Sequence, residues 1–500
     1  MVIFERIVDA RLAVPRCTTN RFDPRTDDDD VDDGQRTGGC RANAGCVGTR
    51  PTLRITSRRV RARACAVPSS VVKRFTMAAN ASASTSTSTF GTARVFALAV
   101  FFVVIARRPR QTCRQLALVV RLTIRLSRYS TIAWVFKLMG LIVYAAVLSP
   151  AFVRVAWTYL TDANIERGVA YGTAGRNALD LYFPNDGGAR GRRRRKRAIG
   201  RSERDKTQDD DDWSEDERKP VVIFVTGGMW IIGYKAWGAL LAQRLARRGV
   251  IVASLDYRNF PQGTVGDMIA DVGNGIGWVL ERLEALGGDK RRVVIVGQSA
   301  GAHISATALL RQTEWTSRSQ RDGGVAAPCS WSPAAISKFI GISGVYAPDD
   351  EALIEHVHRQ GLYKNVFWSI MEAGFSGARA AEALPRASPV SILREYDVRQ
   401  NVRIIPPVML CHGEADTSAP PEQSKMFARA LKNVGIAVDE RYYPDKTHTD
   451  PFVTDPILGR DILLDDITNC IFGRRLQDTF DEKPLIPRIF VAVARKFVPF

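Results

Sequence analysis

Apolar residues in the second half of the chain occur in short runs that are separated by longer stretches with helical spacing. Runs of four to six apolar residues bounded by polar or turn residues are typical of buried strands. The clearest runs are Leu179–Phe183, Val221–Val225, Val250–Leu255, Val293–Val296 and Val408–Cys411. Strands that alternate with helices form a parallel sheet with both faces covered. The pattern therefore predicts an α/β domain with a mostly parallel central sheet and helices on both faces, over residues 161–480.

A highly charged segment interrupts this domain after its first strand. Seven basic residues lie among Arg190 to Arg197, and they are followed by the acidic groups Asp209–Asp212 and Glu215–Glu217. Opposed charge blocks without apolar spacing are typical of solvated loops. We therefore predict a disordered insertion at residues 186–219.

Residues 1–90 contain no apolar pattern that could bury one face of a helix or strand. They combine the acidic run Asp27–Asp30 with arginine clusters and the Ser/Thr-rich tract Ser82–Thr89. This composition predicts a disordered or targeting region. The four aspartates argue against a transit peptide, and Met77 is an alternative start of the protein.

Two apolar segments follow, Val95–Ala106 and Thr131–Val153. As a helix the first would be about 18 Å long, which is short for a hydrocarbon core of about 30 Å, whereas the second is long enough to span. Arginines recur between them at the spacing of a helix lying on anionic lipid, at Arg114, Arg121, Arg125 and Arg128. We predict a membrane-associated helical region at 91–160, with 131–153 transmembrane. The alternative for this region is a helical hairpin packed on the α/β domain. For the C-terminal tail 481–500 two roles stay open, contact with lipid or coverage of the core.

The charge balance supports this assignment. The chain has 71 Lys and Arg against 52 Asp and Glu, a net charge of +19, and much of the excess lies before residue 200. No nucleic-acid-binding motif accompanies it, so we expect a membrane lipid partner and no nucleic acid. The eight cysteines include no C-x-x-C pair. We therefore expect no metal and no cofactor.

The most specific chemical motif is Gly297–Gly301, with the sequence Gly-Gln-Ser-Ala-Gly. It follows the strand Val293–Val296 and precedes a helical run from Ala302 to Leu310. A G-x-S-x-G motif between a strand and a helix is the nucleophile elbow of the α/β-hydrolase fold. We therefore predict that fold, with Ser299 as the nucleophile.

The base must come from five histidines. His303 lies on the helix after the serine, His356 and His358 on a later helical segment, and His412 at the end of a strand. His448 lies in a loop after the apparent strand Val438–Tyr443, where it completes the order Ser, Asp, His of these hydrolases. The order predicts a triad of Ser299, Asp416 and His448, with Glu414 and Asp450 as the alternative acids.

The triad also needs amide donors for the negative charge that develops on the substrate oxygen. Ala300 immediately follows the nucleophile, and the turn Gly227-Gly228-Met229-Trp230 follows the strand Val221–Val225. Glycines in such a turn allow the backbone to approach a substrate closely. The sequence therefore predicts an oxyanion hole built from Ala300 and this turn.

Several strings extend beyond what serine hydrolysis requires and resemble the plant-type isoprenylcysteine methylesterases. They are Thr226–Gly238, Leu255–Gly263, Gly297–Ser305 and Lys446–Asp450, and the similarity runs from about residue 131 to 470. The resemblance implies hydrolysis of the α-carboxyl methyl ester of a prenylated cysteine, free or at a protein C-terminus, at endoplasmic reticulum and Golgi membranes. It implies that Gly227, Gly228, Gln298 and Ala300 contact the substrate beside the triad Ser299, Asp416 and His448. Met229 departs from the pattern, since a smaller residue is expected there.

An apolar stretch at 351–375 lies between late strands, where such folds place a small helical cap. A cap over a lipid-like substrate needs an apolar underside, although a stripe of this kind also forms packed core. Two other functions remain open. The chain could be another carboxylesterase or formamidase for a soluble acyl substrate, or a receptor without activity, which the presence of His448 disfavours.

Overall fold

The computed structural model describes residues 132–185, 188–200, 213–321, 331–362, 364–372, 377–473 and 483–497. The predictions for residues 1–90, the apolar segment Val95–Ala106 and the arginines at 114–128 lie outside these residues.

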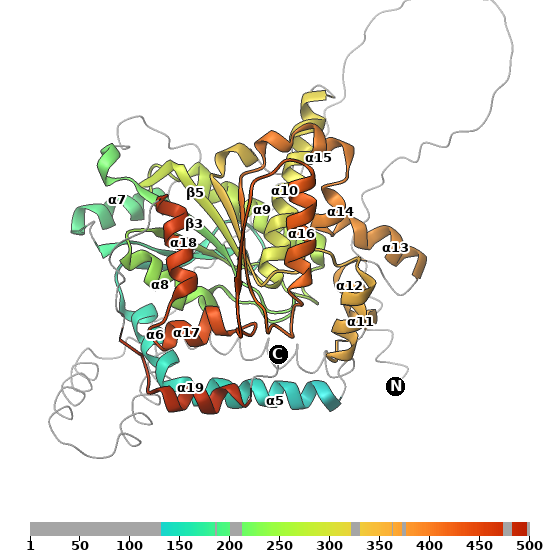
Figure 1. The fold of residues 1–500 in the computed structure, drawn as a ribbon. Coiled ribbons are helices and arrows are strands. Elements are labelled where there is room, and N and C mark those ends of the chain that lie inside the picture. The colour runs from blue at the N-terminus through green and yellow to red at the C-terminus, as the bar shows by residue number, and fades with distance from the viewer. Residues whose placement is uncertain are drawn as a thin grey trace, which may run out of the picture. The chain divides into compact units, whose positions relative to one another are not determined.

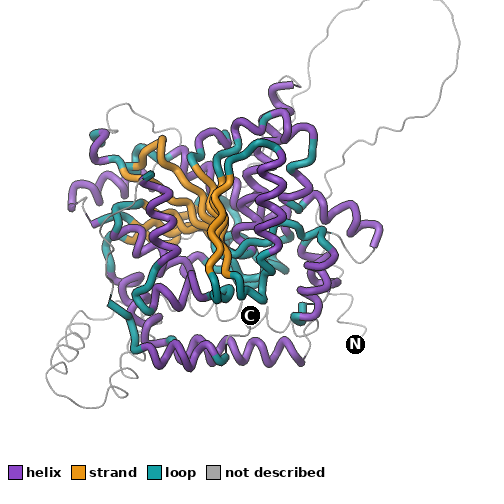
Figure 2. Tube along the Cα trace, in the orientation of Figure 1, coloured by secondary structure: helices purple, strands orange, loops and turns teal. Residues whose placement is uncertain are grey.

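An eight-stranded sheet forms the centre of the molecule, in the order β1-β2-β4-β3-β5-β6-β7-β8 (Figures 1 and 2). The strands are β1 (Ile165–Ala170), β2 (Ala178–Tyr182), β3 (Lys219–Val225), β4 (Ile251–Leu255), β5 (Gly288–Gln298), β6 (Lys338–Ile342), β7 (Val408–Gly413) and β8 (Val438–Tyr443). Strands β3 to β8 are parallel, and only the β1–β2 and β2–β4 pairs are antiparallel. The predicted mostly parallel sheet is confirmed.

Strand β3 shows why this sheet needs a layer on each face. Val221, Ile223 and Val225 belong to one buried apolar cluster, whereas Val222 and Phe224 belong to a second one. Successive side chains of a strand point to opposite faces, so the unbroken apolar run requires both faces to be covered. One cluster includes α9 (Val265–Glu281), α10 (Ala300–Arg321) and α16 (Glu422–Asn433), and the other includes α8 (Ala239–Arg247) and α18 (Ile462–Phe472). These contacts and the strand order show the α/β-hydrolase fold.

Five helices occupy the connection between β6 and β7, where the cap was predicted. They are α11 (Glu351–Arg359), α12 (Lys364–Ile370), α13 (Gly377–Arg386), α14 (Pro389–Ile392) and α15 (Tyr396–Gln400). Leu353, Val357, Phe367 and Ile370 from this connection are buried in the main apolar cluster. The apolar stripe therefore packs inward against the domain.

The described part of the charged segment after β2 differs from its prediction as a disordered insertion at 186–219, whereas residues 186–187 and 201–212 lie outside the described residues. Residues Gly188–Gly200 form helix α7, and β3 begins at Lys219. Arg195 is only 3% exposed, because its guanidinium stacks over the rings of Phe183 and Trp213 at 4.3 and 5.6 Å. Aromatic rings offer a buried guanidinium a favourable environment that charge counting along the sequence does not detect.

Three helices lie at one end of the described domain: α5 (Ile132–Val147), α6 (Ser149–Thr161) and α19 (Arg488–Arg495) (Figure 1). Tyr144, Leu148 and Val491 from these helices are buried in one apolar cluster with Leu240 and Ile457. Among the described helices none alone has the length and hydrophobicity to cross a bilayer, whereas Met139–Val147 and Ser149–Thr161 together do, across a bend of 73°. The transmembrane assignment of 131–153 stays a prediction.

Candidate active site

Ser299 lies at the sharp turn between β5 and α10. Its φ of 54° places it in the left-handed region, which is strained for a residue other than glycine. Gly301 makes the turn possible, because a Cβ there would lie 2.2 Å from the carbonyl oxygen of Val225. A Cβ on Gly297 would likewise lie 2.5 Å from the Cα of Ala302. The motif therefore forms the predicted elbow, with its glycines at two points of close backbone contact.

The acid and the base meet at the same edge of the sheet. Ser299, Asp416 and His448 follow β5, β7 and β8, and the carboxyl ends of parallel strands share one edge. The Nδ1 of His448 lies 2.7 Å from the Oδ2 of Asp416. The two loops are also joined directly, since the amide of Ala415 donates to the carbonyl of Lys446 at 3.0 Å. The geometry thus pairs the two predicted residues and holds them on the edge that carries Ser299.

Asp416 is buried and fully engaged. Its Oδ1 accepts hydrogen bonds from the amides of Ser418 and Ala419 at 2.8 and 3.0 Å. Burial raises the pKa of this carboxyl group, but His448 and the hydrogen bond from His412 outweigh burial and hold the pKa well below its usual range. A charged carboxylate can only accept, so Nδ1 of His448 carries the proton and Nε2 is the nitrogen that can receive one.

The two alternative acids are arranged differently. Glu414 is exposed to solvent. Asp450 is buried, and its oxygens accept from the amide of Thr447 at 3.0 Å and from Arg495, also at 3.0 Å. Among the described residues, the ring of His448 is therefore hydrogen-bonded to Asp416 and to neither alternative.

His412 is a second histidine on the same carboxylate, and its position at a strand end did not reveal this role. Its Nε2 lies 3.1 Å from the Oδ2 of Asp416 and 2.8 Å from the carbonyl of Ala419. Both partners only accept, so Nε2 carries a hydrogen and Nδ1 accepts from the hydroxyl of Ser424 at 2.7 Å. The only sequence signal was its spacing of four residues before Asp416.

The glycine turn after β3 packs directly against the nucleophile. A Cβ on Gly227 would lie 2.7 Å from the Cβ of Ser299 and 2.5 Å from the Oε1 of Gln298. The amide of Gly227 donates to that same Oε1 at 3.2 Å. Gln298 therefore braces the turn against the elbow, and the Gly227 amide is used inside the protein.

The amides of Gly228 and Met229, the next two in the turn, are not bonded inside the described part of the protein in the way the Gly227 amide is. Gly228, Met229 and Trp230 all have positive φ, at 127°, 50° and 62°. None of the hydrogen bonds found within the described residues uses the amide of Gly228 or Met229. With the amide of Ala300 at the first turn of α10, they can serve as donors to a substrate oxygen. Met229, the departure from the expected pattern, would act in this role through its backbone amide and not through its side chain.

Trp230 links this turn to the helix after the nucleophile and to the cap. Its Nε1 donates to the Nδ1 of His303 at 3.0 Å, and the Nε2 of His303 donates to the carbonyl of Ala387 at 2.7 Å. The Trp230 ring also packs edge-on against Phe367 of α12, with centroids 5.8 Å apart. His303 is fully buried, and burial lowers its pKa to about 4, so the ring stays neutral. His303 is a packed residue that supports the site, as expected, and does not act as the base.

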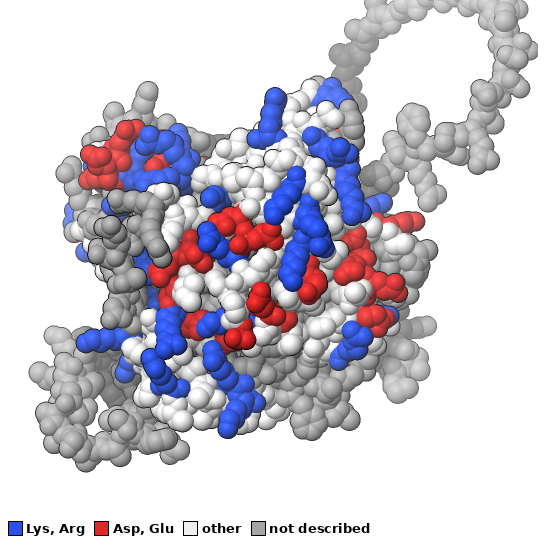
Figure 3. All heavy atoms as spheres, viewed as in Figure 1, with Lys and Arg blue, Asp and Glu red and all other residues white. Residues whose placement is uncertain are grey.

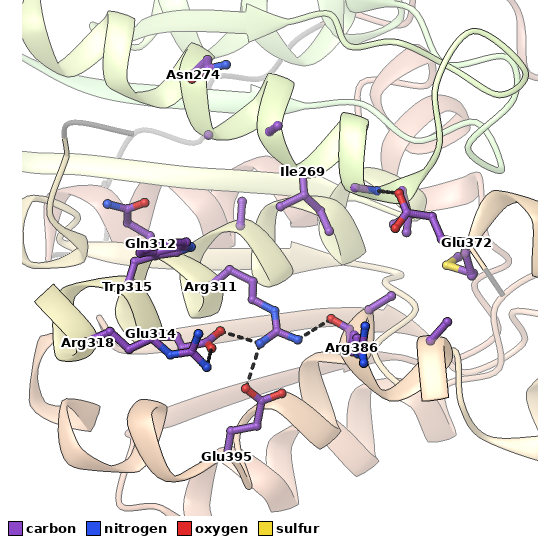
Figure 4. A pocket seen from close by; sticks show the side chains of 18 of the residues that line it. Ile269, Asn274, Arg311, Gln312, Glu314, Trp315, Arg318, Glu372, Arg386 and Glu395 are labelled. Carbon is purple, nitrogen blue, oxygen red and sulfur yellow. Dashed lines mark hydrogen bonds and ion pairs between the residues drawn. The ribbon is translucent and has the colours of Figure 1, made fainter. Parts of the chain in front are cut away.

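A pocket of about 820 Å³ lies farther along α10, between α9 and the cap helices (Figure 4). Ile269 and Trp315 line its apolar part, while Arg311 is bonded to both Glu314 and Glu395. Its residues on α10 begin at Ala308, nine residues past Ser299, or about 13 Å along a helix. None of the predicted triad or oxyanion residues lines this pocket, so it is separate from the candidate active site. In the described part of the chain no cluster of His, Cys, Asp and Glu side chains is arranged as a metal site.

Comparison with known proteins supports the same chemistry as the geometry of the site. Residues 212–431 match the family model BD-FAE. The chain is 38% identical over 392 residues to the isoprenylcysteine alpha-carbonyl methylesterase ICME of Arabidopsis thaliana, covering 77% of this chain and 82% of that relative. It is 41% identical over 392 residues to a probable isoprenylcysteine alpha-carbonyl methylesterase of Oryza sativa subsp. japonica, covering 77% and 84%. A solved structure of Thermogutta terrifontis esterase 2, phosphonylated by sarin, aligns with a TM-score of 0.44 and 20% identity over 64% of this chain and 98% of that chain.

Proposed function

The chain belongs to the isoprenylcysteine alpha-carbonyl methylesterase family, and on that premise we propose that it hydrolyses the α-carboxyl methyl ester of a prenylated cysteine, free or at a protein C-terminus. It is a carboxylic ester hydrolase. The observation that carries the proposal is the 2.7 Å pair of His448 and Asp416 at the sheet edge that also holds the strained Ser299 elbow.

The proposed reaction passes through an acyl-enzyme. The Nε2 of His448 takes the proton of the Ser299 hydroxyl as its Oγ attacks the ester carbonyl carbon, and Asp416 stabilises the imidazolium that forms. The protonated His448 then gives this proton to the departing methoxide, so methanol leaves. A water molecule repeats the sequence on the acyl-enzyme, releases the carboxylate product and restores Ser299.

The oxyanion that forms at the carbonyl needs preorganised donors. The amides of Gly228, Met229 and Ala300 fill this role, while Gly227 and Gln298 hold the turn against the elbow. Each such donor typically contributes about 10²–10³-fold to turnover. Donors that are rigid before substrate arrives need no reorganisation during the reaction, and the Trp230–His303 hydrogen bond supports that rigidity.

We also propose that the enzyme acts on lipid-bound substrate at endoplasmic reticulum and Golgi membranes. The family resemblance and the apolar helix α5 support this location. Expression of the tagged full chain in cells, followed by fractionation on a density gradient, tests it. Recovery with the soluble fraction after gentle lysis would argue against it.

The experiment for the reaction compares two esters and two variants. The full chain should release methanol from farnesylcysteine methyl ester, and Ser299→Ala should abolish the release. Ser369→Ala is the matched control, because that hydroxyl contacts only a backbone carbonyl of the cap at 2.8 Å. Faster turnover of a short soluble aryl ester of equal reactivity would favour a general carboxylesterase instead. A fluorophosphonate probe that failed to label Ser299 would indicate a protein without esterase activity.

A further inference from the structure

Helices α5 and α19 lie side by side, although they are more than 300 residues apart in the sequence (Figure 1). Their inner faces bury Tyr144, Val491 and Ala494 against the domain, together with Leu148 just after α5. Large apolar side chains are exposed on α5 and α19 and just after α19, and we call them the docking face: Met139, Ile142, Ile489, Val493 and Phe497. These are five of the nine exposed large apolar residues among the described side chains. Exposed apolar side chains gathered on two neighbouring helices indicate an interaction site.

The charged residues of the two segments that carry the docking face are basic. Residues 483–497 contain Lys483, Arg488, Arg495 and Lys496 and no acidic residue, and α5 contains one lysine and no acidic residue. The lower rim of the view in Figure 3, where Figure 1 places α19, shows basic and uncharged surface, and acidic side chains gather above it. Apolar side chains flanked by basic ones are the pattern of helices that lie on anionic lipid.

The dimensions of these helices favour lying in the membrane surface over crossing it. The 8 residues of α19 span about 12 Å, and among the described helices none alone is long and apolar enough to cross a hydrocarbon core of about 30 Å. One side of each helix is already packed on the domain. The chain also turns by 73° between Met139–Val147 and Ser149–Thr161. Only the outer side of the helix pair is open to a partner.

The inner side of the pair packs against segments that lead directly to the candidate active site. Leu240 lies in the first turn of α8, just after the oxyanion turn, and Ile457 ends α17 (Asp455–Ile457), just after the base loop. Arg495 of α19 binds Asp450 at 3.0 Å, and Asp450 accepts the amide of Thr447, the residue before His448, at 3.0 Å. The docking face and the catalytic edge therefore belong to one end of the domain.

We propose that α5 and α19 together form a monotopic docking surface for an anionic lipid bilayer, which holds the catalytic edge at the membrane. An ester carried on a prenyl chain would then be presented close to the base loop. The proposal rests on the proposed function only for the identity of that ester, because binding of the bilayer is measured separately from activity.

Flotation of the purified full chain with phosphatidylcholine vesicles, with and without phosphatidylserine, provides the first test. Ile489→Asp and Val493→Asp should each weaken binding at least tenfold. Ala381→Asp, on an exposed position of α13, adds the same charge elsewhere and should not. Arg488→Gln and Lys496→Gln should each reduce binding about fivefold, and only with phosphatidylserine present. Equal flotation of Val493→Asp and Ala381→Asp would overturn the proposal.

A local measurement excludes binding through another part of the chain. A photo-crosslinking amino acid at position 489 should form lipid adducts on anionic vesicles, whereas one at position 381 should not. The proposal would be overturned if position 489 crosslinked to a second copy or to its own chain, and if these crosslinks formed equally with and without vesicles. The aspartate variants should keep wild-type turnover of a soluble aryl ester and lose it for vesicle-borne farnesylcysteine methyl ester. Loss of both would indicate misfolding, and a wild-type protein that binds vesicles but cleaves neither ester would refute only the proposed function.

Discussion

Replacing Asp416 by asparagine changes one oxygen of the carboxylate to an NH₂ group that donates. In the wild-type protein both N–H groups near Oδ2, from His448 at 2.7 Å and His412 at 3.1 Å, point at an acceptor. The amides of Ser418 and Ala419 hold the Oδ1 side, so the asparagine oxygen is expected to stay there and the NH₂ to face the histidines. His448 must then accept at Nδ1 and carry its hydrogen on Nε2.

The size of the effect follows from this change of tautomer. A histidine protonated at Nε2 cannot take the serine proton, and the equivalent change in serine proteases lowers kcat by about 10⁴. That ratio corresponds to about 5 kcal/mol of transition-state stabilisation. The KM should change little, because Asp416 is buried beneath His448 and is not exposed to the substrate.

Steady-state kinetics with farnesylcysteine methyl ester measure the effect, and far-UV circular dichroism and thermal unfolding check the fold. Glu414→Gln is the matched control, since this exposed carboxylate lies two residues away, and it should keep wild-type kcat. If the Asp416 variant kept more than a tenth of wild-type kcat, or if the Glu414 variant lost as much, the assignment of the acid would be wrong.

Three further outcomes are expected. Gly227→Ala should abolish fluorophosphonate labelling of Ser299, because the new Cβ would lie 2.7 Å from the serine Cβ; labelling at the wild-type rate would contradict the close packing. Trp230→Phe should lower kcat about tenfold more than it raises KM. Either Trp230→Phe or His303→Phe alone leaves the other partner of their hydrogen bond buried and unpaired, which costs about 1–3 kcal/mol. In a double-mutant cycle the effects of the two changes should therefore be less than additive. The pKa of His303 is lowered from 6.5 to about 4, so the unfolded state binds more protons between these values and stability falls as the pH drops through this window. Urea unfolding should show a loss of roughly 3 kcal/mol from pH 7 to pH 4, reduced in His303→Gln.

Local sequence determined the elements that carry the chemistry. An apolar run such as Val221–Val225 can only be a strand covered on both faces, and G-x-S-x-G between a strand and a helix permits little besides an elbow. The order of Ser299, Asp416 and His448 along the chain favoured these three residues and left Glu414 and Asp450 as alternative acids, because the topology of parallel strands brings the carboxyl ends of the strands to one edge. These features depend on residues that are neighbours in the sequence or on a fixed strand order.

Tertiary structure decided which of several similar groups meet. Asp416 rather than Asp450 receives His448, because Asp450 is held by Arg495 from the far end of the chain. The second histidine on Asp416 and the use of the Gly227 amide by Gln298 are also set by packing. Such pairings depend on distances of a few ångströms between elements, and hydrophobic periodicity does not encode them.

The same reason explains the segments 131–153 and 481–500. Sequence alone left the tail 481–500 between lipid and core, and α19 proves to bury one side and expose the other. The stretch at 131–153 has the composition of a membrane span, yet its described part forms α5 and the start of α6 with a bend between them, and Tyr144, Leu148 and Ala151 are buried in the cluster that includes Val491 of α19. Composition determines that a segment will leave water, whereas the surface that receives it is formed only when distant parts of the chain fold together.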